Sequence, residues 1–174
     1  MALEPFFSLT PLSPSTYTYD PAQPDAPHVY AAMRTFGGHT RQSPPYSLAD
    51  QAANDEIILG YDAVELDDQE ILSDDEHVFR RSAAYFWFHP YNVTADNQYL
   101  LVFGLRDHGH RPDVQFFIGL DFIRQDTVAN WNEQIAILID AVPNQRVNLF
   151  MRVAAPEEQY YTRVGLLGFT CYLL

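Results

Sequence analysis

Two histidines separated by one residue are the side chains of this sequence best suited to metal chemistry. His108 and His110 lie in the polar stretch Arg106-Asp107-His108-Gly109-His110-Arg111-Pro112-Asp113, between two segments with alternating apolar residues. Alternate side chains of an extended chain point to the same side, so both imidazoles can face one metal ion. The competing interpretation is a polar hairpin loop with Gly109 and Pro112 as its turn residues.

The His-x-His pair resembles the first motif of the cupin family, whose fold is a jelly-roll barrel. This resemblance implies a metal-binding enzyme that uses His108 and His110. The cupin motif continues with a glutamate four or five residues after the second histidine, where this sequence has Val114 and Gln115. No histidine follows His110, so the second cupin motif lacks its own histidine. A cupin-like metal-binding enzyme is therefore an alternative, and the main interpretation includes neither a metal nor a cofactor.

Carboxylates gather in the segment Asp67–Glu76, whose oxygens are the ligand type that calcium prefers. The segment lacks the alternating acids and the central glycine of an EF-hand loop. A solvated run of charge is the competing interpretation, and it would also discourage pairing between sheet edges. A divalent cation at Asp67–Glu76 is thus a candidate partner only.

The sequence contains no complete catalytic motif. It has no Gly-x-Ser-x-Gly elbow, and the absence of lysine excludes a phosphate-binding Gly-x-x-x-x-Gly-Lys loop. The single cysteine, Cys171, stands in the apolar ending Gly168–Leu174, which predicts a small buried side chain more than a nucleophile. We therefore expect a protein that is not an enzyme.

The charge balance excludes two classes of partner. The chain has 23 acidic residues and 10 basic ones, all of them arginine, for a net charge of −13. Nucleic acid and anionic membrane surfaces require basic patches, so neither nucleic-acid binding nor direct membrane insertion is expected. Acidity without lysine fits a halophilic host or a genome rich in GC. No secretion signal is visible at the N-terminus.

Composition divides the chain into an extended N-terminal arm, residues 1–49, and a domain, residues 50–174. The arm holds eight of the 12 prolines, which disfavour continuous sheet or helix, and only a short helix at Ala26–Met33 is expected. Its apolar side chains must dock on this domain or on a neighbouring subunit, because exposing them to water is unfavourable. The predicted interface residues are Phe6, Phe7, Leu9, Leu12, Tyr17, Tyr19, Tyr30 and Phe36.

Residues 50–174 carry one strand signal after another. The segments are Glu56–Leu66, Phe79–His89, Gln98–Arg106, Asp113–Ile123, Gln134–Val142, Gln145–Ala154, Gln159–Val164 and Leu166–Leu174. Gly165 is expected to be a bulge or kink, and Thr127–Glu133 a helical turn. About eight short strands predict an all-β fold, a single jelly-roll-like β-sandwich or barrel behind the arm.

Aromatic side chains cluster in Tyr85-Phe86-Trp87-Phe88, with Tyr91 nearby. Such rings can stack on sugars, although a strand normally buries every second one. A carbohydrate- or protein-binding β-sandwich is therefore a further alternative.

The β domain, the arm with its apolar side chains and the strand at the C-terminus together resemble the small single-jelly-roll capsid proteins of membrane-containing icosahedral viruses. The resemblance is one of architecture, without a shared residue motif. It implies a virion structural protein, a capsid wall or decoration subunit, that assembles with copies of itself and with other virion proteins. The expected location is the virion, assembled in the host cytoplasm.

Overall fold

A computed structural model describes residues 3–36, 56–61, 83–108, 111–154 and 162–174. Within these ranges every regular element is a β-strand. The described residues contain no helix long and apolar enough to cross a membrane. The prediction of an all-β fold is therefore confirmed.

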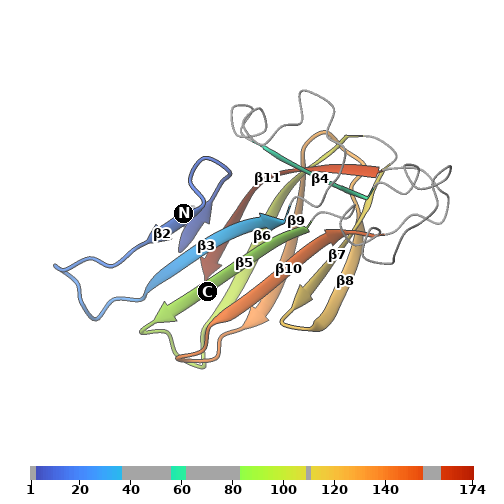
Figure 1. The fold of residues 1–174 in the computed structure, drawn as a ribbon. Helices are drawn as coiled ribbons and strands as arrows, with labels where there is room; N and C mark the ends of the chain where they lie inside the picture. The colour runs from blue at the N-terminus through green and yellow to red at the C-terminus, as the bar shows by residue number, and fades with distance from the viewer. Residues whose placement is uncertain (1–2, 37–55, 62–82, 109–110, 155–161) are drawn as a thin grey trace, which may run out of the picture.

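The strands form two antiparallel sheets that pack face to face (Figure 1). The five-stranded sheet contains, in spatial order, β1 (Phe7–Leu9), β11 (Thr162–Leu173), β6 (Gln98–Asp107) and β9 (Glu133–Asp140), with β4 (Ile57–Tyr61) also pairing with β11. The six-stranded sheet contains, in spatial order, β2 (Ser15–Tyr17), β3 (His28–Phe36), β5 (Ala83–Tyr91), β10 (Val147–Val153), β7 (Asp113–Ile118) and β8 (Asp121–Thr127).

Strands β4 to β11 follow the connectivity of a jelly roll. The chain passes between the sheets at almost every step, and only β7 and β8 are consecutive in one sheet. The last strand lies between the first and third of this set, as the interleaving of a jelly roll requires. The sandwich predicted from the sequence is thus the observed fold.

Two predicted boundaries were wrong, and the errors compensate in the strand count. The segment Asp113–Ile123 is a hairpin of β7 and β8 that turns at Gly119, whose φ is 58°. The last two predicted strands form one, β11. Its bulge lies at Leu167 and not at the predicted Gly165. Residues 128–132, expected as a helical turn, are irregular.

The N-terminal segment docks on its own domain. β1 pairs with β11 and β3 pairs with β5, so residues 7–36 contribute to both sheets. The expected helix at Ala26–Met33 is wrong, because most of that segment lies in β3. Prolines 11, 14, 21, 24 and 27 lie outside the strands, where a missing N–H donor costs nothing. The predicted boundary at residues 49 and 50 lies outside the described residues.

The predicted interface residues occupy different environments. Phe7 and Leu9 are 4% and 1% exposed and belong to the core, and Phe6 packs against it. The side chain of Phe36 is not among the parts of the chain that the structure describes. Four others are exposed in this chain: Leu12, Tyr17, Tyr19 and Tyr30.

The core between the sheets is rich in aromatic side chains. Phe103 of β6 contacts Phe86, Phe116 and Phe169 from three other strands, with ring centroids 5.4, 4.8 and 5.0 Å away. Cys171 is fully buried, as expected, and its burial raises the pKa of the thiol. This packing holds the two sheets in one arrangement.

Arg124 of β8 joins the edges of the two sheets. Its Nη1 donates to the carbonyl oxygen of Ala136 in β9 at 2.9 Å. Its Nε and Nη2 donate to the Asp126 carboxylate at 2.6 and 2.8 Å, and this hydrogen bonding raises the pKa of Arg124.

Candidate functional site

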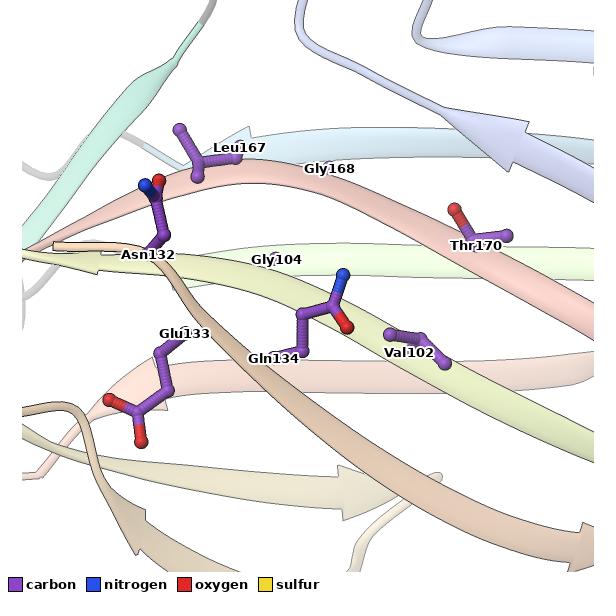
Figure 2. A pocket seen from close by; sticks show the side chains of 8 residues that line it. All are labelled: Val102, Gly104, Asn132, Glu133, Gln134, Leu167, Gly168 and Thr170. Atoms are coloured by element: carbon purple, nitrogen blue, oxygen red, sulfur yellow. The ribbon is translucent and has the colours of Figure 1, made fainter. Parts of the chain in front are cut away.

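A groove of about 650 Å³ crosses the outer face of the five-stranded sheet. Figure 2 shows its lining residues on three elements: β6, β11 and the start of β9 with the residue before it. The lining is mainly small or polar: Val102, Gly104, Asn132, Glu133, Gln134, Leu167, Gly168 and Thr170. Such a lining exposes backbone and hydrogen-bonding groups together.

Two glycines on neighbouring strands form the floor of the groove. Gly104 of β6 is the direct partner of Gly168 of β11, and the bulge at Leu167 precedes this pair. Figure 2 shows the pair between Leu167 and Asn132 on one side and Val102 and Thr170 on the other. Without side chains at the pair, a ligand can approach the sheet backbone closely.

Trp131 stands next to the groove, directly before the lining residue Asn132. Its side chain is 58% exposed, although large aromatic residues are usually mostly buried. The guanidinium carbon of Arg106 lies over the indole, 4.1 Å from the ring centroid. Arg106 Nε also donates to the Trp131 carbonyl oxygen at 3.1 Å, so one arginine supports both ring and backbone.

A buried carboxylate anchors this arginine. Glu56, just before β4, is 8% exposed, and its Oε2 accepts from Arg106 Nη1 at 3.2 Å. The same oxygen lies 3.1 Å from His108 Nε2, and the His108 ring contacts Trp131 with centroids 5.3 Å apart. Gly165 leaves room for the side chains of Glu56 and His108, since a Cβ at this position would lie 2.5 Å from Glu56 Oε2.

The loop that carries Trp131 is closed by Glu133. Its Oε2 accepts hydrogen bonds from the backbone N–H groups of Ala129 and Asn130, at 2.9 and 3.1 Å, and from Asn130 Nδ2 at 3.2 Å. Arg106 Nη2 donates to Asn132 Oδ1 at 3.3 Å on the other side of the tryptophan. Bonds on both sides thus fix the backbone that presents the indole.

The described residues that line the groove are mostly uncharged. Among the described residues that line the groove, Glu133 is the one carboxylate, and it already accepts three hydrogen bonds. The groove offers amide and hydroxyl groups and open backbone, and the exposed ring of Trp131 stands beside it.

The residues proposed from sequence for metal binding are not assembled into a metal centre in the described part of the chain. His108 turns its Nε2 towards Glu56, whereas His110 and the acidic segment Asp67–Glu76 lie outside the described residues. No group of three or more His, Cys, Asp or Glu side chains in the described ranges could hold a metal ion. The cupin-like alternative stays a prediction.

Trp131 was missed because Thr127–Glu133 was interpreted as a helical connection. The signal was present: the tryptophan is flanked on both sides by asparagine, in the connection between two strand segments. The role of Arg106 could not be predicted, because Glu56 lies 50 residues away in sequence.

A second hollow, of about 460 Å³, lies on the outer face of the six-stranded sheet. The aromatic cluster found in the sequence divides at this sheet: Phe86 and Phe88 are buried, whereas Tyr85 and Trp87 face outwards and line the hollow. The other lining residues are Ala32, Met33, Arg34 and Arg146.

No protein-family model matches the chain, and no curated protein matches it. Several solved structures of carbohydrate-active proteins show a distant likeness. For a family two carbohydrate esterase from Clostridium thermocellum in complex with cellohexaose, the identity is 12% and the TM-score 0.35, over 67% of this chain and 32% of that one. For the C-terminal CBM6 of LamC from Zobellia galactanivorans, the values are 8% and 0.35, over 66% and 98%.

A family two carbohydrate esterase from Cellvibrio japonicus gives 9% identity and a TM-score of 0.38, over 96% of this chain and 34% of that one. The chain thus spans about a third of the length of these esterases. At such values the likenesses assign no function, and the sandwich is defined by its own strand pairing.

Proposed function

We propose that this β-sandwich is a carbohydrate-binding module that holds a neutral sugar chain in the groove, with one sugar ring stacked on Trp131. The observation that supports this proposal best is an indole that is 58% exposed and yet held in place by Arg106. An exposed tryptophan with no ligand would leave a large apolar surface in water. An indole that is held in one orientation offers a preformed surface on which a sugar ring can stack.

The pyranose ring has an apolar C–H face that packs on an aromatic ring, while its hydroxyl groups form hydrogen bonds at the edge. Immobilising a flexible side chain on binding costs about 0.5–1.5 kcal/mol. Because the contacts of Arg106 and Glu133 already order the Trp131 loop, much of this cost is met during folding. This preorganisation lowers the free-energy cost of binding, so that a ligand with few contacts can still bind.

Hydrogen-bonding groups lie where the hydroxyl groups of a stacked sugar chain would continue. Asn132 uses its Oδ1 to accept from Arg106, so its amide N–H groups remain to donate. Gln134 and Thr170 add an amide and a hydroxyl group across the groove. The volume of about 650 Å³ lies within the ~300–1,000 Å³ range of small-molecule sites.

The test is a titration of the full chain with neutral hexasaccharides that differ in linkage, followed by tryptophan fluorescence. The protein has two tryptophans, so a Trp87→Phe background makes Trp131 the only reporter. At least one hexasaccharide should shift the Trp131 emission in a saturable way. Trp131→Ala, in the wild-type background, should weaken that binding at least about tenfold by calorimetry, which corresponds to about 1.4 kcal/mol.

The matched control is Trp87→Ala, which removes an indole from the opposite sheet and should leave the affinity unchanged. Equal loss in both variants would point to a general effect on folding. If no neutral glycan in the panel binds, or if Trp131→Ala binds as the wild type does, the proposal is wrong.

The virion role expected from sequence stays a prediction. Its main argument was that the apolar side chains of the arm need a neighbouring subunit. Phe7 and Leu9 find their surface in the core of the same chain, so this argument no longer favours assembly.

A further inference from the structure

The hollow on the six-stranded sheet is lined by two arginines and two aromatic rings. Arg34 lies on β3 directly opposite Tyr85 of β5, and Arg146 precedes β10. The small Ala32 lies opposite Trp87 and leaves the space between these side chains open. This pocket is on the opposite face of the sandwich from the Trp131 groove.

Arg34 and Arg146 differ from two other arginines in their charged partners. Arg106 and Arg124 each pair with a carboxylate. In the ranges that the structure describes, no carboxylate forms an ion pair with Arg34 or Arg146, although acids outnumber bases by 23 to 10 in the chain. Two cationic groups without a described anion therefore line one small pocket.

The pocket walls are held in place by ring contacts. The guanidinium carbon of Arg146 lies 4.0 Å from the centroid of the Trp87 ring, and Tyr30 packs against the same ring at 5.2 Å. Tyr85 contacts Phe150 at 5.4 Å. A guanidinium stacked on a ring keeps its N–H groups in its own plane, where they can still donate to an anion.

We propose that this pocket binds the anionic group, a carboxylate or a sulfate, of an acidic saccharide, with the sugar ring against Tyr85 and Trp87. Guanidinium groups match the planar geometry of carboxylates and form the stronger, charge-assisted hydrogen bonds. A volume of about 460 Å³ suits one or two sugar rings. This site is independent of the neutral-glycan groove.

The net charge favours a sparsely charged ligand over a nucleic acid. Double-stranded DNA carries one charge per ~1.7 Å, and a protein of net charge −13 repels such a polymer. An acidic sugar carries about one charge per ring, so the local pair of arginines can outweigh the long-range repulsion. Screening by salt should weaken binding, since Arg34 is exposed.

The experiment is calorimetry of the full chain with trigalacturonate and with its methyl ester, which keeps the rings but removes the charges. We expect saturable binding of the acid and at least tenfold weaker binding of the ester. Arg34→Gln should lose at least tenfold in affinity for the acid, and Arg34→Lys less. Calorimetry with a sulfated disaccharide and with inorganic sulfate completes the comparison. Binding of the disaccharide alone supports recognition of a sulfate carried on a sugar ring, and equal binding of both contradicts it.

The control variant is Trp131→Ala, which should bind trigalacturonate as the wild type does even where it loses neutral glycans. Failure of the neutral-glycan proposal is thereby distinguishable from failure of this one. Equal affinity for acid and ester, or unchanged affinity in both Arg34→Gln and Arg146→Gln, would overturn the acidic-saccharide site. Tighter binding of a hexathymidylate or hexaglutamate, lost in the same variants, would overturn it in favour of another polyanion.

Discussion

Gly104 of β6 and Gly168 of β11 are direct partners in the floor of the groove, but only Gly168 is tightly packed against another strand. A Cβ at Gly168 would lie 3.0 Å from the backbone oxygen of Leu9, because β1 approaches closely there. A Cβ at Gly104 would find its nearest neighbour, Leu167 Cβ, at an ordinary 3.5 Å. The open floor at Gly104 is therefore not a demand of the fold.

We predict that Gly104→Val fills the groove and abolishes neutral-glycan binding without loss of stability, since valine suits a strand. Gly168→Val should instead lower the free energy of unfolding by about 1–3 kcal/mol, through strain against β1. Urea denaturation and glycan titration of both variants measure the two effects. If the Gly104→Val protein is stable and still binds the glycan, the ligand does not bind in the groove.

Replacing Arg106 by methionine should release the Trp131 loop. The buried Glu56 carboxylate would lose one donor, which should cost about 1–3 kcal/mol of unfolding free energy. In a Trp87→Phe background, the fluorescence anisotropy of Trp131 should fall as the ring gains motion. Arg34→Met is the matched control, because Arg34 is exposed and has no described carboxylate partner. Unchanged anisotropy in Arg106→Met would contradict the supporting role.

Stability should fall at alkaline pH through Cys171. Its pKa is raised in the folded protein by burial, so the thiol stays protonated there while the unfolded chain ionises above about pH 8.5. The stabilisation is thus complete below that pH and is lost as pH rises, by up to about 1.4 kcal/mol per pH unit. Urea denaturation from pH 7.5 to 9.5 measures the slope, and Cys171→Ala should remove this contribution.

Phe7→Ala should destabilise the isolated chain by about 3–5 kcal/mol, because its ring is 4% exposed and packs against Phe88 and Phe169. Leu12→Ala, at a position that is 61% exposed, should change stability by less than about 0.5 kcal/mol. Thermal denaturation of both variants at low concentration provides the comparison. If both variants are equally stable, Phe7 does not stabilise its own chain, and the prediction of an arm that contacts a neighbouring subunit regains its support.

Alternation of apolar residues predicted the strands whose two faces differ most. In β6 the inward side chains Tyr99, Leu101, Phe103 and Leu105 alternate with partly exposed residues, and the predicted span nearly matches the observed one. The pattern failed at Gly119 because apolar residues continue through the turn, where Leu120 is 97% exposed. Prolines in the arm hid β3, since they fall between strands and not within them.

The site was harder to predict than the fold, since its parts come from distant segments. Trp131, Arg106, Glu56 and Gly165 meet only after β4, β6 and β11 have paired. Periodicity states which face a residue occupies but not which residue from another strand stands beside it. The exposed tryptophan in a polar connection was the one local signal, and the helical interpretation obscured it.

The contact of Arg124 with the carbonyl oxygen of Ala136 also bears on solubility. Among the strands that the structure describes, β9 lies at the edge of its sheet, and a free carbonyl at an edge can pair with a strand from another molecule. Arg124, which is ion-paired with Asp126, occupies that acceptor and so removes one pairing position from this edge. Loss of this acceptor disfavours edge-to-edge pairing locally, whatever the net charge of the chain.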